Sequence, residues 1–192
     1  MVCMEKLSDT DRRFLLRLAR STIAAELNKG EPARPPVPLP PVLKQKRGCF
    51  VTLHKKGMLR GCIGTIEPVT PLVDGIAENA VNAAFRDPRF PPLSPEEIDV
   101  VHLEVSLLTV PEILEFRNSD ELLEKLEPGE HGVILSKGWH RATFLPQVWE
   151  QLPDKISFLE HLCRKAGMAK DCWQDPDVEV QVYFVEHFGE TD

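Results

Sequence analysis

The chain of 192 residues carries 30 acidic and 23 basic side chains, a net charge of −7, and 42% of its residues are hydrophobic. This length suits one domain or two small intertwined lobes, and the composition is typical of a globular protein. No apolar run approaches the roughly 18–20 residues of a membrane helix, and the first residues lack a signal peptide's apolar segment. We therefore expect a cytoplasmic protein that does not enter a membrane. We also expect no non-specific nucleic-acid binding, which needs clustered basic residues.

The cysteine pattern favours reduced thiols and gives no indication of a metal site. Five cysteines, an odd number, occur without the C-x2-C spacing of zinc or thiol-redox sites. They are Cys3, Cys49, Cys62, Cys163 and Cys172. Cys163 falls on an apolar helical stripe, which favours a packing role over a chemical one.

The first predicted element is a helix that Ser8 or Asp9 can cap and that ends near Gly30. A proline-rich connector follows over 31–47, since six of the chain's 17 prolines fall within 32–41. Such a run is extended and polyproline-like. It is either a ligand for a proline-binding module or, as we favour, a stiff strap across the surface.

A β-hairpin and a helix are predicted next. The hairpin pairs 49–54 with 58–66, and Gly57 provides the positive φ that its turn needs. In the helix, Thr70 is the expected N-cap, followed by proline at the first helical position. An apolar stripe then runs to Phe85 and stops before an Asp-Pro pair.

The segment after this helix contains a capping-box pattern and a strand. The sequence from Ser94 to Glu97 reads S-x-x-E, which predicts a short helix. A strand is expected over 99–108, with apolar residues on one face and polar ones on the other. A further helix begins near Asn118 and ends before Pro128.

The second half repeats the order of the first, with a hairpin, a helix and a strand. The hairpin spans 132–145, the helix follows its cap Asp154, and the strand covers 178–184. Lysine, glycine and arginine of the first hairpin recur 81 positions later. An internal duplication is therefore the leading architectural inference, with halves at about 48–110 and 131–187 of a single domain over 1–192. The fold class predicted is α+β, with one curved, mainly antiparallel sheet and helices outside it.

The hexapeptide at 59–64, Leu-Arg-Gly-Cys-Ile-Gly, is the most unusual feature of the chain. Glycine weakens a strand, so Gly61 and Gly64 indicate a bulge, or close approach by another backbone or a ligand. Arg60 and Cys62 share a face of an extended strand, where a cation would favour the thiolate form of the sulfur. Alternatively, Cys62 is a small buried side chain and the glycines merely allow curvature.

Two other groups of residues could take part in chemistry. His102, Glu104 and Ser106 alternate along one strand and could provide a base, a carboxylate and a hydroxyl, although such a face is more often simply solvated. The loop 86–90, Arg-Asp-Pro-Arg-Phe, could clamp an anion or stack a base, because guanidinium forks suit phosphate and carboxylate. A salt bridge that anchors the loop is the alternative.

These motifs resemble the AMMECR domain family. The segments that carry the resemblance are 48–53, 59–64, 83–93, 105–108, 144–149, 158–167 and 182–184. The resemblance implies two β3-α2 repeats that form a single barrel-like antiparallel sheet. It also implies association with Memo-type and radical S-adenosylmethionine proteins, without an established reaction or a known cofactor.

Two hypotheses for function follow. In the first, the chain handles a ligand or substrate within a radical-SAM/Memo-linked system, or is purely a module that binds an anionic ligand or protein. The binding residues would be Arg60, Gly61, Gly64, Arg86, Asp87, Arg89 and Phe90. In the second, the chain is an enzyme that acts by covalent catalysis. Cys62 is then the nucleophile, and Glu104 or His102 is the base if their strand neighbours that of Cys62. The sequence does not decide whether the chain is an enzyme.

Overall fold

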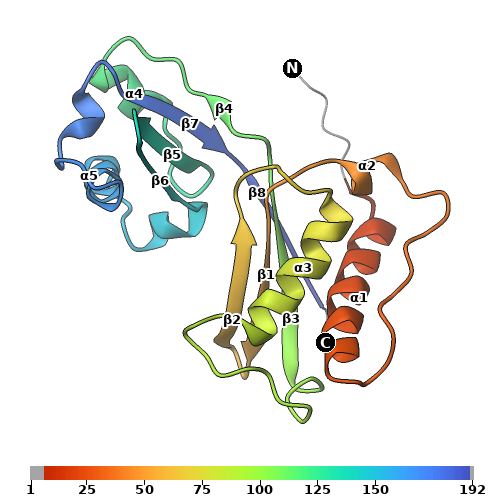
Figure 1. The fold of residues 1–192 in the computed structure, drawn as a ribbon. Helices are drawn as coiled ribbons and strands as arrows, with labels where there is room; N and C mark the ends of the chain where they lie inside the picture. The colour runs from red at the N-terminus through yellow and green to blue at the C-terminus, as the bar shows by residue number, and fades with distance from the viewer. Residues whose placement is uncertain (1–6, 191–192) are drawn as a thin grey trace. The chain divides into compact units, whose positions relative to one another are not determined.

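The fold is described from a computed structural model of residues 7–190. The chain forms two compact units, each with its own sheet (Figure 1). Unit 1 contains the chain up to Leu107 and the segment from Glu186 onward, and unit 2 contains Leu108–Val185. The extent of the domain, 1–192, stays a prediction.

Unit 1 contains a four-stranded sheet with the strand order β2-β1-β3-β8. Its strands are β1 (Cys49–Lys55), β2 (Met58–Thr65), β3 (Val101–Leu108) and β8 (Val185–Gly189). Its helices are α1 (Asp9–Glu26), α2 (Pro41–Lys44) and α3 (Leu72–Phe85). β1 pairs antiparallel with both β2 and β3. β2 and β8 are therefore the edge strands of this sheet.

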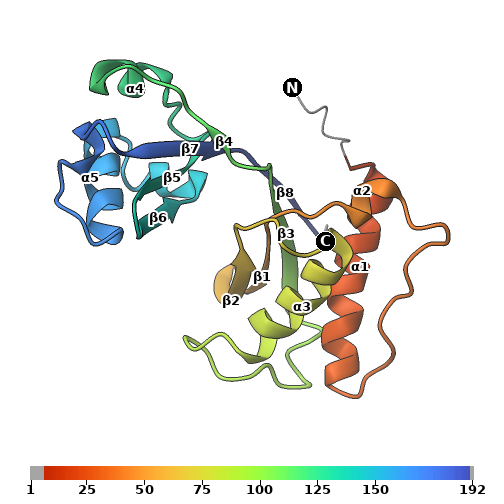
Figure 2. The same cartoon turned by 45° about the horizontal axis from the view of Figure 1, so that its top comes forward.

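One face of the unit 1 sheet is apolar and packs against α1 and α3. Val51, Leu53 and Val105 are fully buried there, in one cluster with Leu15 of α1 and Ile76 of α3. Figures 1 and 2 show both helices on this same face. Because side chains alternate across a strand, the neighbours of these residues in β1 and β3 point to the opposite, helix-free face.

Unit 2 has a second antiparallel sheet with the order β4-β7-β5-β6. Its strands are β4 (Glu112–Ile113), β5 (Gly132–Lys137), β6 (His140–Phe144) and β7 (Glu179–Tyr183). Its helices are α4 (Ser119–Lys125), α5 (Lys155–Lys165) and the 3-10 turns η1 (Pro146–Glu150) and η2 (Cys172–Gln174). Its core is separate from that of unit 1, with Trp149 stacked on Phe158 at a centroid distance of 3.6 Å.

The predicted α+β class with antiparallel sheets is confirmed, but the single barrel-like sheet is wrong. The described strands form two open sheets of four, because each sheet covers its apolar face with its own helices and fills its own core. In both sheets the first hairpin strand lies between its partner and the strand that follows the helix. This correspondence agrees with a duplication but does not establish one, so the internal repeat stays a prediction.

Several local expectations are corrected by the structure. Ser8 caps α1 as predicted, but α3 begins at Leu72 after Pro71, with no side-chain cap from Thr70. The segment 94–97 forms turns instead of a helix, although the Glu97 carboxylate accepts from the Ser94 amide as a capping box requires. The same carboxylate also binds Lys55 and Arg60.

The C-terminal part of the chain also differs from expectation. The strand predicted over 178–184 is the shorter β7, and β8, which follows it, joins the sheet of unit 1. Cys163 and Cys172 form a disulfide, which corrects the expectation of reduced thiols there. The turn after α5 brings the two sulfur atoms together although the residues are nine positions apart. Cys3 lies outside the described residues.

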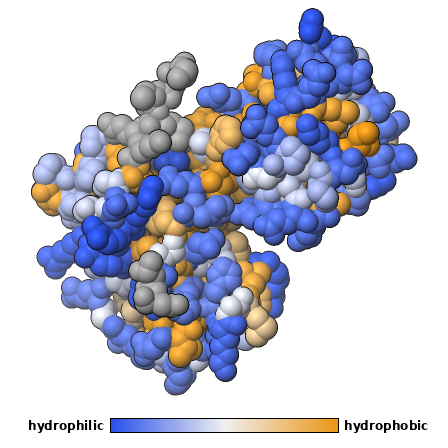
Figure 3. Space-filling model, turned by 180° about the vertical axis from the view of Figure 1, so that it is seen from behind, coloured by the Kyte–Doolittle hydropathy of each residue, from blue (hydrophilic) through white to orange (hydrophobic). Residues whose placement is uncertain are grey.

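The view in Figure 3 is dominated by hydrophilic side chains, with hydrophobic ones in small groups between them. None of the helices within residues 7–190 has the length and apolar character needed to cross a membrane.

Candidate functional site

The hexapeptide 59–64 lies in the edge strand β2, and a β-bulge interrupts it at Arg60. Leu53 of β1 pairs with Gly61, but the next residue, His54, pairs with Leu59. Arg60 is therefore the extra residue on the bulged strand. A bulge redirects a side chain, so the simple alternation that would place Arg60 and Cys62 together does not hold here.

The two glycines of the hexapeptide allow close packing within the protein. A Cβ on Gly61 would lie 2.1 Å from the carbonyl oxygen of Ala83 in α3, and one on Gly64 would lie 2.3 Å from the Phe50 ring. Of the explanations that the sequence left open, the structure shows a bulge and the close approach of another backbone. The space that Gly64 leaves beside the strand is filled by Phe50.

The outer edge of β2 is bound at Cys62 by the loop that follows α3. The backbone N–H of Cys62 donates to Asp87 Oδ2 at 2.9 Å, and Arg89 Nη2 donates to the Cys62 carbonyl at 3.1 Å. Asp87 and Arg89 also form a bidentate ion pair, with distances of 2.9 and 2.7 Å. The pair satisfies both backbone groups that an edge strand would otherwise expose at this residue.

The ion pair keeps both side chains of the clamp, Asp87 and Arg89, in their charged forms. The hydrogen bonds from Arg89, together with that from the Cys62 amide, hold the pKa of Asp87 well below its usual range. The same pair raises the pKa of Arg89, with a smaller contribution from the Cys62 side chain. The Asp87 side chain is 2% exposed and that of Arg89 is 53% exposed, so the clamp has a fixed anion inside and an accessible cation outside.

Arg60 binds a different carboxylate and does not form the expected pair with Cys62. Its Nε and Nη2 donate to the two oxygens of Glu97 at 3.0 and 2.9 Å, and Lys55 reaches the same carboxylate at 2.8 Å. These cations lower the pKa of Glu97 to about 2. The guanidinium that binds Cys62 is that of Arg89, which donates to its backbone carbonyl.

Cys62 is half-buried, and its sulfur faces the helix-free side of the sheet. Thr52 lies directly opposite it on β1, and its hydroxyl donates to Cys62 Sγ at 3.2 Å. Glu104 on β3 is opposite Thr52 in turn, so Cys62, Thr52 and Glu104 form one row across three strands. Neighbouring strands are about 4.8 Å apart, so the backbone of Glu104 is roughly 10 Å from that of Cys62, two strands away.

The condition for Glu104 or His102 as a base to Cys62 is therefore not met, because β1 separates their strand from β2. His102 pairs with His54 one row further along. Glu104 lies instead near β8, where His187 Nδ1 is 3.7 Å from its carboxylate and 2.9 Å from the Ser106 hydroxyl. Both contacts involve the same ring nitrogen of His187, whereas the histidine of a catalytic triad contacts its carboxylate and its hydroxyl through different nitrogens. Glu104, His187 and Ser106 therefore do not form a triad.

The remaining predicted residues lie around the clamp. Phe90 is 5.5 Å from the Arg89 guanidinium carbon and 6.0 Å from that of Arg60, so its ring contacts both cations. Arg86 is exposed, and its Nη1 donates to Asn82 on the preceding turn of α3. Cys49 is buried against Asn79, and burial raises the pKa of its thiol to about 11, which makes it a packing residue.

Comparison with known proteins identifies the family. The sequence profile of the AMMECR1 family matches residues 16–188, most of the chain. The chain belongs to the AMMECR1 family. A protein of Methanothermobacter thermautotrophicus is 44% identical over 185 residues, which cover 96% of each chain. Protein MK0488 of Methanopyrus kandleri is 44% identical over 98% of this chain and 92% of its own. The crystal structure of PH0010 from Pyrococcus horikoshii matches with a TM-score of 0.82 at 40% identity, covering 97% of this chain and 94% of that one.

The sequence of this AMMECR1-family chain singles out the loop 86–90 and Cys62, but it does not indicate three of their partners. Thr52 reads as an ordinary strand residue, and only the register of β1 against β2 puts it beside the sulfur. Glu97 was assigned to a capping box, and indeed it accepts from the Ser94 amide at 3.0 Å as well as from Arg60. His187 lies in β8, a strand that was not predicted separately from the one over 178–184.

Proposed function

We propose that this AMMECR1-family chain handles a ligand or substrate within a modification system that also contains a Memo-type and a radical-SAM protein. The observation that supports this most is the half-buried Cys62, whose backbone is clamped from one side and whose sulfur accepts a hydrogen bond from Thr52. A thiol held in this way is preorganised for contact with a bound molecule. We place the system in the cytoplasm, as the composition predicts.

Handling is a better match to this geometry than independent covalent catalysis. A base within hydrogen-bond reach would activate Cys62 as a nucleophile, but the contact from Thr52 is a donor to the sulfur. Glu104 and His102 lie on a strand two positions away in the sheet. Cys62 therefore acts as a contact or attachment point, and a partner protein carries out the chemistry.

Charge at the site favours an anionic group on the ligand. Arg89 is half exposed although it is paired, Arg86 is exposed nearby, and the Phe90 ring lies beside the guanidinium of Arg89. Guanidinium forks bind carboxylate and phosphate, and an aromatic ring adds apolar area. Arg60, Gly61, Gly64 and Asp87 shape and hold the strand that presents the thiol.

We also propose that the two sheets derive from a duplication, with halves at about 48–110 and 131–187. The support is the shared strand order, in which β2-β1-β3 corresponds to β6-β5-β7, each set with a helix between its second and third strands along the chain.

Site-directed cross-linking tests the proposed function. In a Cys3→Ser background, benzophenone maleimide is attached to Cys62 and the protein is irradiated with the purified Memo-type or radical-SAM protein from the same genome. Cys49 is buried and Cys163 is bonded to Cys172, so the label goes to Cys62. We expect a defined cross-linked product with at least one of the two proteins, and its loss in Arg89→Ala because the clamp and the exposed cation are removed together.

The matched control moves the label to an exposed position in unit 2, in the variant Cys3→Ser/Cys62→Ser/Lys170→Cys. Cross-linking of equal yield from both positions, or none from Cys62, would contradict the proposal. A further comparison separates the role of the thiol from that of the cation. If unlabelled Cys62→Ser retains partner binding while Arg89→Ala loses it, the chain binds through charge and Cys62 is only a contact.

A further inference from the structure

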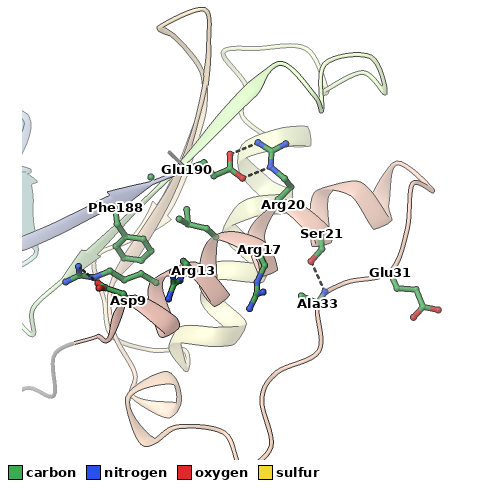
Figure 4. Close-up of a pocket in the computed structure, with 12 residues that line it drawn as sticks. Asp9, Arg13, Arg17, Arg20, Ser21, Glu31, Ala33, Phe188 and Glu190 are labelled. Atoms are coloured by element: carbon green, nitrogen blue, oxygen red, sulfur yellow. Dashed lines mark hydrogen bonds and ion pairs between the residues drawn. The ribbon is translucent and has the colours of Figure 1, made fainter. Parts of the chain in front are cut away.

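A groove of about 900 Å³ runs along α1 on the opposite edge of the same sheet from the Cys62 clamp. Figure 4 shows its walls: α1, the start of the proline-rich connector and the end of β8. The Ser21 hydroxyl accepts from the backbone N–H of Ala33 at 2.7 Å and so holds the connector against α1. Leu16, Ala33 and Phe188 give the groove an apolar floor.

The charges in this groove leave two arginines available. Arg20 forms a bidentate pair with Glu190, and Arg12 pairs with Asp9 and Glu186. By contrast, no carboxylate within residues 7–190 pairs with Arg13 or Arg17. Both are exposed, and Figure 4 shows them extending from the same side of α1, one helical turn apart. In a chain with a net charge of −7, this is a local positive site.

The other wall is the edge strand β8. The Glu190 amide donates inward to the Leu103 carbonyl of β3. Because backbone groups alternate in direction along an antiparallel strand, the N–H and C=O of Gly189 are directed away from β3, toward the free edge. Gly189 also lines the groove. An edge strand flanked by a helix is the arrangement that extended peptides use when they add a strand to a sheet.

We propose that this groove binds an extended acidic peptide segment of a partner protein, added as a strand along β8. Arg13 and Arg17 bind its carboxylates, and Leu16, Ala33 and Phe188 contact the apolar side chains between them. The spacing supports this occupant. Arginines one turn apart on a helix are separated by about 6 Å along its axis, and alternate residues of a strand by about 6.8 Å. Acidic side chains at every second position therefore match the two guanidinia.

The length and the remaining charges favour a peptide over a nucleic-acid strand. The groove follows α1 from Asp9 to Ser21, about 18 Å at 1.5 Å per residue, which accommodates about five extended residues. Glu31 on the connector and the carboxylates of Asp9 and Glu190 also line it. A continuous row of phosphates would meet these acidic groups, whereas a peptide can place apolar residues there. This site is independent of the function proposed for Cys62.

The test measures fluorescence anisotropy of the full chain with a fluorescein-labelled hexapeptide, Glu-Val-Asp-Phe-Glu-Val. We expect saturable binding that weakens on the order of tenfold in Arg13→Glu/Arg17→Glu, since two ion pairs become repulsive. Lys44→Glu/Lys56→Glu is the matched control, with the same change of charge at two exposed lysines of unit 1, and it should bind within about twofold of the wild type. A peptide with lysine at the three acidic positions should bind at least tenfold more weakly.

A third peptide, N-methylated at alternate residues to remove the backbone donors that would face β8, tests the strand addition itself. We expect this peptide to lose binding while it keeps the same charge and side chains. Failure of the wild-type chain to bind the acidic peptide would overturn the proposal. Equal binding of the N-methylated peptide, or equal weakening by the two double variants, would also overturn it, because the interaction would then be charge attraction without a strand.

Discussion

At Arg60, a charge that the sequence places beside a thiol is bound by a carboxylate 37 residues further along the chain. The Arg60 side chain is 10% exposed and that of Glu97 is 16% exposed, so the pair is largely removed from water. Hydrogen bonds between charged groups in such surroundings are stronger than surface pairs, and loss of one partner leaves a buried charge. Glu97 therefore fixes the position of the bulge residue and of Lys55 at once.

The first prediction at this scale concerns Glu97→Gln and pH. The pKa of Glu97 is about 2 in the folded chain, against about 4.3 for an unfolded glutamate, so its pairing stabilises the fold above pH 4.3. This stabilisation is lost as the pH falls through 2, because below that pH the carboxyl is protonated in both the folded and the unfolded state. We expect Glu97→Gln to lower the free energy of unfolding of unit 1 by about 2 kcal/mol at pH 7, and the difference from wild type to disappear near pH 2.

These free energies are measured for unit 1 by urea denaturation, with hydrogen exchange of the backbone amides of β1 and β3 as the probe of unfolding. Glu78→Gln, at an exposed position on α3, is the control and should follow the wild type at every pH. If the difference in free energy of unfolding between Glu97→Gln and wild type stays constant from pH 7 to pH 2, the negative charge of Glu97 does not contribute to stability and this prediction is wrong.

At the scale of elements, β2 is held on three sides by different means. β1 pairs with one edge, the Asp87–Arg89 clamp binds the other, and α3 packs so closely over Gly61 that no side chain fits. The unusual composition of the hexapeptide therefore follows from the requirements of an edge strand packed under a helix backbone. The clamp binds the backbone of Cys62, while its sulfur accepts from the Thr52 hydroxyl on the helix-free face.

Gly61→Ala tests this explanation. Its Cβ would lie 2.1 Å from the Ala83 carbonyl oxygen, which is backbone and cannot move without shifting α3. We expect a loss of about 2–4 kcal/mol in the free energy of unfolding of unit 1. Gly189→Ala in the edge strand β8 is the matched control, since its nearest contact would be an ordinary 3.4 Å, and it should change stability by less than about 0.5 kcal/mol. Equal effects of the two variants would show that strand propensity, and not the close approach, is responsible.

The elements that could be predicted from the sequence are those specified by local signals. Ser8 and Asp154 cap the helices that they were expected to cap, and Asn118 caps the helix that was expected to begin near it, because a cap depends on residues three positions away. The Lys56-Gly57 turn, likewise local, takes the positive φ values that its sequence indicates. By contrast, the partners of Arg60 and Cys62 depend on strand register and on a bulge, which local periodicity does not contain. Within α5, Ile156 is 45% exposed, whereas Phe158 is fully buried in the core of unit 2.

At the scale of the whole chain, the two sheets have separate cores, and unit 2 is one continuous segment. Its two ends are already joined, because the Thr109 amide donates to the Phe184 carbonyl and the Phe184 amide donates to the Thr109 hydroxyl. Unit 1, by contrast, needs a distant segment: Glu190 binds Arg20 and the Leu103 amide. A chain that ends at Leu107 therefore lacks an edge strand and a partly buried ion pair of its own unit.

From this difference we expect the fragment 108–185 to fold alone and the fragment 1–107 to fold poorly. The first contains a complete four-stranded sheet, the disulfide Cys163–Cys172 and the stacked pair of Trp149 on Phe158. It should melt cooperatively and retain the near-ultraviolet circular dichroism of its buried Trp149 and Trp173. Adding the peptide 186–192 through a short glycine-serine linker to 1–107 should restore cooperative melting to unit 1, because β8 and Glu190 then return. If 108–185 shows no cooperative transition while the full chain does, the two cores depend on each other and the division into units is only geometric.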